Sequence, residues 1–257
     1  MTMNAVNTIT PEQYKSDSLK LSEALKNDDA YEGVITAQKL DNGAYAVLSW
    51  YSDMVWTLNP NKFPQSVPEN KQKIDFTLVP SCFVAAAKRD VANNISQRLA
   101  GGTVVTNAVS LRPFFGYLAS IHITSTSAIT PLVAMQYVDH CKALKVGRGH
   151  KNTGKPLSKS VLSSRLAAVE RLQKTLAGTA HQFAYPWPES SAKYLAGIKK
   201  SDALKPKTEL IPDDVFVRIF EYANGYLQRA NKLLSLHDDI EKNQRTLRKS
   251  LKFHDRK

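Results

Sequence analysis

Apolar and polar residues follow two patterns along this chain, and the change between them separates a mixed first part from a helical second part. Residues 31–38 and 44–50 are rich in Val, Ile, Thr and aromatic side chains, which is typical of strands. Asn42-Gly43 between them supplies positive-φ residues for a tight turn, so we expect a β-hairpin. Further elements expected before residue 103 are a helix over 12–26, a short strand at Val55–Leu58, and a helix over 83–100 that ends at Gly101-Gly102.

From Thr103 onward the apolar spacing is helical. The apolar residues between Val104 and Leu118 recur near the 3.6-residue period of a helix, and Pro113 is expected to kink that helix. Thr130-Pro131 is an N-cap followed by proline, which predicts a helix to about Leu144. The clearest helix spans 158–177 and has one apolar stripe: Leu162, Leu166, Val169, Leu172 and Leu176. A further short helix is expected over 190–200. Together, the hairpin in the first part and the helices in the second predict an α+β fold that is mainly α.

A long helix is expected after Pro212, because Asp213 and Asp214 suit the positive end of a helix dipole. The spacing of Phe216 and Phe220 predicts core positions. Between Asp213 and Leu234 the apolar residues form one stripe without an obvious partner in the chain, so the stripe predicts folding back on the core, self-association or binding of another protein. Its members are Phe216, Ile219, Phe220, Ala223, Tyr226, Leu227, Ala230, Leu233 and Leu234.

The net charge of +12 is unevenly distributed. Residues 1–100 contain 10 Lys and Arg against 11 Asp and Glu, whereas residues 101–257 contain 25 against 12. Such asymmetry indicates a polyanionic partner, either nucleic acid or an anionic membrane. No apolar run approaches the roughly 20 residues of a membrane-spanning helix, and the first residues lack the order of a signal peptide. We therefore expect double-stranded DNA rather than a membrane.

Cysteine and histidine usage argues against a cofactor or metal site. Cys82 and Cys141 form no CxxC pair, and the six histidines are isolated from one another and from cysteine. This pattern fits a reducing, cytoplasmic environment. No phosphate-binding loop, nucleophile elbow or His-Glu-x-x-His pair occurs, and none of the ten tyrosines lies near residues that would activate it.

The strongest candidate for binding is a basic segment over 142–174, which has nine Lys and Arg against one acid, Glu170. Its loop contains Gly147, Gly149 and Gly154, and glycines let backbone N–H groups and lysines approach phosphates closely. The loop members predicted to bind DNA are Lys145, Arg148, Lys151, Lys155 and Lys159. The alternative is a solvated loop without a partner.

The helix over 158–177 extends this candidate site. Its face opposite the apolar stripe is small and basic, formed by Ser160, Ser164, Ala167 and Arg171 and flanked by Lys174. Such a face lets a helix backbone lie close to a DNA groove. Arg165 borders the apolar stripe, so it is either a structural residue or a DNA ligand. Tyr185-Pro-Trp-Pro188 is expected to be a turn docked on the core rather than a stacking platform.

Residues from about 103 to 200 resemble the core-binding, SAM-like domain of tyrosine recombinases (phage-type integrases). The stretches that carry the resemblance are Val109 to Leu118, Thr130-Pro-Leu and Ser158 to Leu172, and Lys207 to Phe216 is similar to the linker and first helix of that family's catalytic domain. The resemblance implies three parts: an N-terminal region over 1–100, a helical core-binding domain over 103–204, and a linker with the first catalytic-domain helix over 205–257. It also implies that the segment from Ser158 to Lys174 lies along a DNA groove, and that Lys199, Lys200, Lys205 and Lys207 cross the backbone.

The chain departs from the family in its catalytic residues. Family catalysis requires two arginines, a lysine, a His-x-x-Arg element and a tyrosine nucleophile, and no His-x-x-Arg occurs here. We therefore expect DNA binding by a bacterial or phage-encoded, nucleoid-associated part of an integrase from a mobile element, without strand cleavage by this chain. The rival hypothesis is an assembly factor that uses the stripe of Asp213–Leu234.

Overall fold

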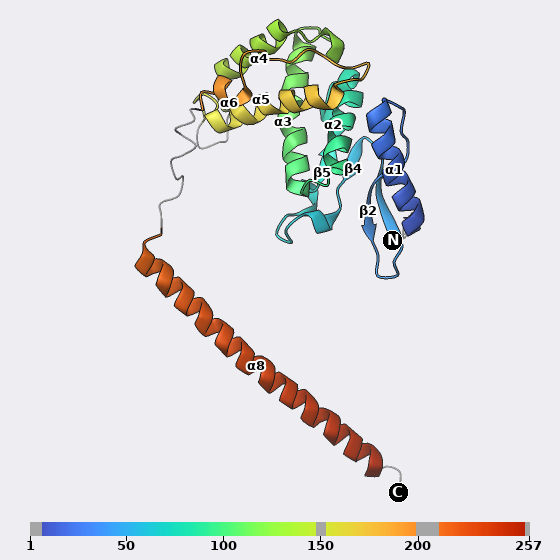
Figure 1. Ribbon diagram of the computed structural model, residues 1–257, viewed down its shortest axis with the longest axis vertical. Coiled ribbons are helices and arrows are strands. Elements are labelled where there is room, and N and C mark those ends of the chain that lie inside the picture. Colours follow the sequence, from blue (N-terminus) through green and yellow to red (C-terminus); the bar gives the residue numbers. More distant parts are fainter. Residues whose placement is uncertain (1–6, 148–152, 199–210, 255–257) are drawn as a thin grey trace. The chain divides into compact units, whose positions relative to one another are not determined.

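A computed structural model describes residues 7–147, 153–198 and 211–254 (Figure 1). Within 245–254 only the helical backbone is described. The chain divides into two compact units, Met1–Lys200 and Ser201–Lys257. The architecture is α+β and mainly α, as predicted from the sequence.

The first unit begins with a helix and a small sheet. Thr10 caps α1 (Pro11–Asn27): its side chain accepts from the Gln13 amide at 3.2 Å, and the Gln13 side chain accepts from the Thr10 amide at 2.9 Å. The sheet has the order β1-β3-β2 with antiparallel pairing, and its strands are β1 (Thr8–Ile9), β2 (Val34–Lys39) and β3 (Tyr45–Trp50).

The predicted hairpin is therefore confirmed, with one difference in its turn. Gly43 has a φ of +84°, but Asn42 is not among the residues with positive φ. Instead the Asn42 side chain accepts a hydrogen bond from the Ala44 amide at 3.0 Å, so it shapes the turn through its oxygen rather than through its backbone.

The predicted strand at Val55–Leu58 is β4 (Val55–Thr57), and it pairs with an unpredicted strand, β5 (Lys73–Asp75). Trp56 on β4 is fully buried, and its ring meets Phe76 edge-on at 4.8 Å between centroids. Short 3-10 helices connect these strands to each other and to the helices: η1 (Pro60–Lys62), η2 (Glu69–Lys71), η3 (Phe76–Leu78) and η4 (Ser81–Phe83).

The helices of the first unit, with one further 3-10 turn, are α2 (Val84–Ser96), α3 (Gly101–Ser120), η5 (Thr126–Ala128), α4 (Pro131–Ala143), α5 (Lys159–Leu176) and α6 (Ala192–Leu195). Thr130 caps α4 as predicted, and Ser158, expected to be the first residue of the next helix, is the cap of α5. The helix expected over 190–200 is shorter within the described residues. Helix α3 runs through Pro113.

The expectation that Gly101-Gly102 ends a helix was wrong, because these glycines begin α3. Helix α2 stops at Ser96, and the left-handed residue after it is Arg98, with a φ of +57°. The physical reason for Gly101 is space: a Cβ there would overlap the Phe63 ring. A close approach of backbone to an aromatic ring explains this glycine, rather than a helix end.

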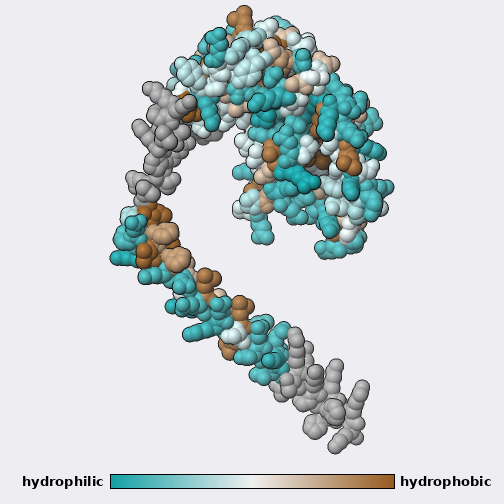
Figure 2. All heavy atoms as spheres, in the orientation of Figure 1, coloured by the Kyte–Doolittle hydropathy of each residue, from teal (hydrophilic) through white to brown (hydrophobic). Residues whose placement is uncertain are grey.

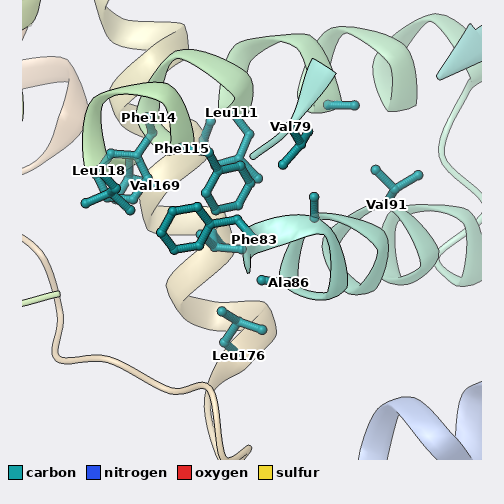
Figure 3. Packing of buried hydrophobic residues seen from close by; sticks show 14 of the residues in the cluster. Val79, Phe83, Ala86, Val91, Leu111, Phe114, Phe115, Leu118, Val169 and Leu176 are labelled. Atoms are coloured by element: carbon teal, nitrogen blue, oxygen red, sulfur yellow. The ribbon is translucent and has the colours of Figure 1, made fainter. Parts of the chain in front are cut away.

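One hydrophobic core runs through the first unit. Its members extend from Leu21 on α1 to Ala196 beside α6, and Phe83 stacks on Phe115 with centroids 5.1 Å apart (Figure 3). The residues predicted to form a separate N-terminal region over 1–100 thus share a core with the helices predicted as the next domain, 103–204. The boundary near residue 100 falls inside one packed unit because Trp56, Phe76 and Phe83 belong to the same core cluster as buried residues of α3 and α5.

In the second unit the described residues form α8 (Asp213–His254), which begins directly after Pro212 as predicted. Phe216 and Phe220, which were expected at core positions, are 58% and 66% exposed on this helix, so α8 by itself supplies no core for them. The periodicity indicated one apolar face correctly, but periodicity alone does not supply the surface that covers it.

Candidate nucleic-acid interface

Helix α5 is the central element of the candidate interface. The Ser158 hydroxyl accepts from the Val161 amide at 3.3 Å and so fixes the start of the helix. The predicted stripe is buried without exception, from Leu162 at 6% exposure to Leu166 and Leu172 at 0%. Helices α2, α3, α4 and α6 all contact α5, which therefore has only a narrow solvent-exposed surface.

The glycine-bearing loop before α5 has an ordered neck. Lys145 and Pro156 form an antiparallel bridge, the Val146 amide donates to the Lys155 carbonyl at 2.8 Å, and the Gly154 amide donates to the Val146 carbonyl at 2.9 Å. Gly154 has a φ of +80°, which permits this return of the chain. Lys145 and Lys155 lie on the two sides of this neck, just before α5 in the chain, and both are exposed.

Exposed lysines gather around the start of α5. Lys142 at the end of α4, Lys145 and Lys155 at the neck, and Lys159 on the first turn of α5 are all exposed. These four residues are called the lysine cluster below. Across the described residues of 142–198 the exposed Lys, Arg, Asp and Glu side chains are six lysines and one acid, Glu189. A surface with this balance has a positive potential that favours phosphates.

The one acid on α5 is used inside the protein. Glu170 Oε1 accepts from Trp187 Nε1 at 2.8 Å, from the Ala192 amide at 2.7 Å and from the Tyr185 hydroxyl at 3.4 Å. Trp187 is 1% exposed, so the turn over 185–188 is docked on the core, as predicted. Glu170 is also 11 residues along α5 from Lys159, about 16 Å, so its carboxylate is remote from the lysine cluster.

Glu170 also positions α6 beside α5. Ala192 at the start of α6 is tied to Glu170, and at the other end Gly197 lies by Lys159, whose Cε is 3.8 Å from the position a Gly197 Cβ would take. The two helices therefore run in opposite directions. Lys193 and Tyr194 on this helix are exposed, the latter by 76%.

The structure corrects the placement predicted for Arg171. Its guanidinium faces inward, 3.3 Å from the fully buried Asp90 carboxylate on α2, and its Nη2 donates to the Asn107 carbonyl on α3 at 3.0 Å. Burial raises the pKa of Asp90, although Arg171 and the hydroxyl of Thr175 act against that rise. The face of α5 expected to be open is covered at Arg171 because α2 and α3 pack there.

Arg165 is half-buried, which favours the structural alternative left open from the sequence. Its Nη1 atom is buried and has no hydrogen-bond partner. Burial raises the pKa of the Tyr137 hydroxyl on α4, and the nearby charge of Arg165 acts in the opposite direction. Arg165 is thus held between α4 and α5 rather than presented on the surface.

The remaining predicted residues divide into three groups. Ser160 and Ser164 are exposed on the first half of α5, next to Lys159, and Ser158 is exposed at the cap. Lys174 is exposed but lies about 22 Å along the helix from Lys159, at 1.5 Å per residue. Six predicted residues lie outside the described residues: Arg148, Lys151, Lys199, Lys200, Lys205 and Lys207.

Sequence reasoning missed the contributions of Lys193, Tyr194 and Glu170. Lys193 and Tyr194 lie in a segment that the sequence predicted as helical, and its basic character was a usable signal. The role of Glu170 had a weaker signal, namely that it is the one acid in a basic helix followed by an aromatic turn.

Comparisons with protein-family models, with curated proteins and with solved structures give no match for this chain. The resemblance to the recombinase core-binding domain therefore rests on the sequence stretches alone. Among the described residues, no helix combines the length and apolar character that crossing a bilayer requires. In the same residues no group of three or more His, Cys, Asp or Glu side chains is placed to hold a metal ion.

Proposed function

We propose that the first unit binds duplex DNA through phosphate contacts made by the lysine cluster, Lys142, Lys145, Lys155 and Lys159, with Lys193 on neighbouring α6. The observation that carries the proposal is the charge balance of this surface, where lysines are exposed and the one acid on α5 is bonded internally. The hydrogen bonds of the neck and the cap of α5 fix the backbone that carries these lysines, which lowers the entropic cost of ordering them on a phosphate backbone.

The proposal includes the biological setting that the sequence resemblance implies. The chain would act as the DNA-gripping part of a bacterial or phage-encoded site-specific tyrosine recombinase, in the cytoplasm and at the nucleoid. It would hold recombination-site duplex without cutting it. Ser160 and Ser164 on the exposed part of α5 are the residues placed to approach base edges or sugars.

Salt dependence of DNA binding tests this proposal. Each phosphate neutralised by a lysine contributes about −0.9 to the slope of log affinity against log salt. Replacing Lys145, Lys155 and Lys159 together by Glu is expected to weaken binding to a duplex of about 30 base pairs at least tenfold. The slope should become shallower by about three units. Fluorescence anisotropy at several NaCl concentrations measures both quantities.

The matched control changes the same net charge elsewhere. Lys20, Lys62 and Lys71 are exposed lysines of the first 100 residues, and their replacement by Glu should affect affinity less and leave the salt slope nearly unchanged. Equal losses in the two triple variants would show that net charge alone drives binding. No duplex binding by the parent chain at low salt would overturn the proposal.

A further inference from the structure

Helix α8 has a pattern of apolar residues that fits pairing with a helix of the same kind. Bulky apolar side chains occur at intervals of seven, at Ile219, Tyr226, Leu233 and Ile240, and all four are exposed by about half or more. A second set, offset by three to four residues, comprises Phe216, Ala223, Ala230, His237 and Gln244. Alternating spacings of three and four over four heptads are typical of a coiled-coil seam. Figure 2 shows apolar side chains along this part of α8.

The helix requires such a partner on physical grounds. At 1.5 Å per residue, the 42 residues of α8 extend about 63 Å. A long helix in water gains most of its stability from packing of its apolar face rather than from intrinsic propensity. The apolar face of α8 is exposed in this unit: the side chains of Phe216, Phe220 and Leu233 are 58%, 66% and 66% exposed.

We propose that α8 pairs antiparallel with α8 of a second copy of this chain. In the antiparallel register proposed here, residue 230 of one helix lies opposite residue 233 of the other. This register sets a small residue against a large one at two levels of the seam. Ala230 then meets Leu233, and Ala223 meets Ile240. Parallel pairing would instead set Ala223 against Ala223 and Ala230 against Ala230, which leaves gaps between larger layers.

Polar positions of the seam fit the same register. Tyr226 lies at the level of His237 of the second copy, so a phenol hydroxyl faces an imidazole, two groups that can hydrogen-bond to each other. The flanking residues Phe220, Leu227 and Leu234 form a row that antiparallel pairing sets beside the same row of the second helix. Parallel pairing would set Leu234 beside Arg229.

Charge complementarity gives a separate argument for the direction. Residues 213–221 contain three acids and one arginine, whereas residues 242–257 contain seven Lys and Arg and one acid. Antiparallel pairing brings the acidic start of one helix near the basic end of the other, and it also opposes the two helix dipoles. Parallel pairing would bring like charges together at both ends.

Sedimentation velocity on the full chain tests the pairing. We expect a dimer, and Leu233→Asp in the seam should raise its dissociation constant at least 100-fold. Val217→Asp is the matched control, because Val217 is 50% exposed on α8 but lies outside the seam, so this variant should remain dimeric. All three tryptophans precede residue 200, so unchanged tryptophan fluorescence confirms an intact first unit in each variant. A monomeric parent chain, or a dimer insensitive to Leu233→Asp, would overturn the proposal in favour of another cover for the stripe.

Disulfide trapping tests the direction. With exposed Cys82 replaced by Ser, the double variant Ala223→Cys, Ile240→Cys should give covalent dimers under mild oxidation. Either single variant should not, because in the antiparallel register equivalent residues lie 17 positions apart, about 25 Å. Efficient cross-linking of both single variants would establish parallel pairing and disprove the antiparallel register.

Discussion

Helices α5 and α8 have similar apolar stripes and very different surroundings. On α5 the stripe from Leu162 to Leu176 is at most 6% exposed, covered by α2, α3, α4 and α6. On α8 the stripe around Leu227 and Leu233 is more than 60% exposed at those residues. Similar periodicity therefore predicts a helix and its apolar face in both cases, but the residues that cover the face come from other parts of the fold or from another molecule.

The two helices also differ in how their polar residues are used. On α5, Glu170 and Arg171 are bonded to neighbouring elements, so charged groups stabilise tertiary structure. On α8, Asp213, Asp214 and Arg218 are exposed in the described structure. A charged residue near a helix stripe is thus ambiguous from sequence, because burial by neighbours decides whether it faces water or a buried partner.

The largest expected effect comes from breaking the ion pair that ties α5 to α2. Arg171→Met leaves the Asp90 carboxylate buried without its guanidinium partner and should lower the free energy of unfolding by about 3–5 kcal/mol. Urea denaturation followed by circular dichroism measures the loss. Lys174→Met, an exposed change on the same helix, should stay within about 0.5 kcal/mol. A loss below about 1 kcal/mol for Arg171→Met would show that the pair is not a structural tie.

A pair of identical substitutions compares the two stripes directly. Leu172→Ala on α5 creates a cavity in a closed core and should cost about 2–5 kcal/mol. Leu227→Ala on α8 should leave unfolding of the first unit unchanged, as followed by tryptophan fluorescence. Equal costs would mean that the α8 stripe packs into the same cooperative unit as α5.

A smaller effect is expected at the tie between α5 and α6. Glu170→Ala removes the acceptor for Trp187 Nε1 and the Ala192 amide and should cost about 1–3 kcal/mol. The tryptophan fluorescence emission should shift to longer wavelength as Trp187 becomes more exposed to solvent. If α6 contributes Lys193 to DNA binding, the salt slope should also fall by about one unit. Glu170→Gln keeps an acceptor oxygen and should restore both signals in large part; a Gln variant as impaired as Ala would indicate that the charge itself matters.

The smallest expected effect concerns pH. Burial raises the pKa of Asp90 above 3.8, so at pH values just above 3.8 the folded chain binds this proton more tightly than the unfolded chain does. Asp90 therefore makes stability fall as pH rises through that range. Asp90→Asn should remove this component, so its stability should rise more, or fall less, with pH than that of the parent. Parallel pH profiles from urea titrations would contradict the assignment.

Much of the fold could be predicted from local signals. The caps at Thr130 and Ser158, the turn glycine Gly43 and the stripe of α5 are dictated by backbone geometry and periodicity over a few residues. Strand β5, the role of Gly101 and the inward placement of Arg171 could not be predicted in this way. Each depends on a contact with residues distant in sequence: Val55, Phe63 and Asp90, respectively.

The candidate site divides in the same way. The lysines at the loop neck were predicted because local charge density and glycines were sufficient signals. The outer face of α5 was predicted too broadly, since the helical wheel contains no information about α2 and α3. Lys193 and Tyr194 were missed because their position depends on the hydrogen bonds of Glu170 across 22 residues.

The contact between Gly101 and the Phe63 ring has a practical consequence for dividing the protein. A fragment starting at residue 103 would contain every lysine of the proposed interface, yet it would lack Phe63, Trp56 and Phe83 beneath its helices. The apolar surface that these residues cover would be exposed to solvent, and we expect the fragment to aggregate, which would prevent a measurement of its DNA affinity. The smallest fragment suited to binding studies therefore begins ahead of Thr8 and extends past Ile198, so that β1 and α6 remain at its two ends.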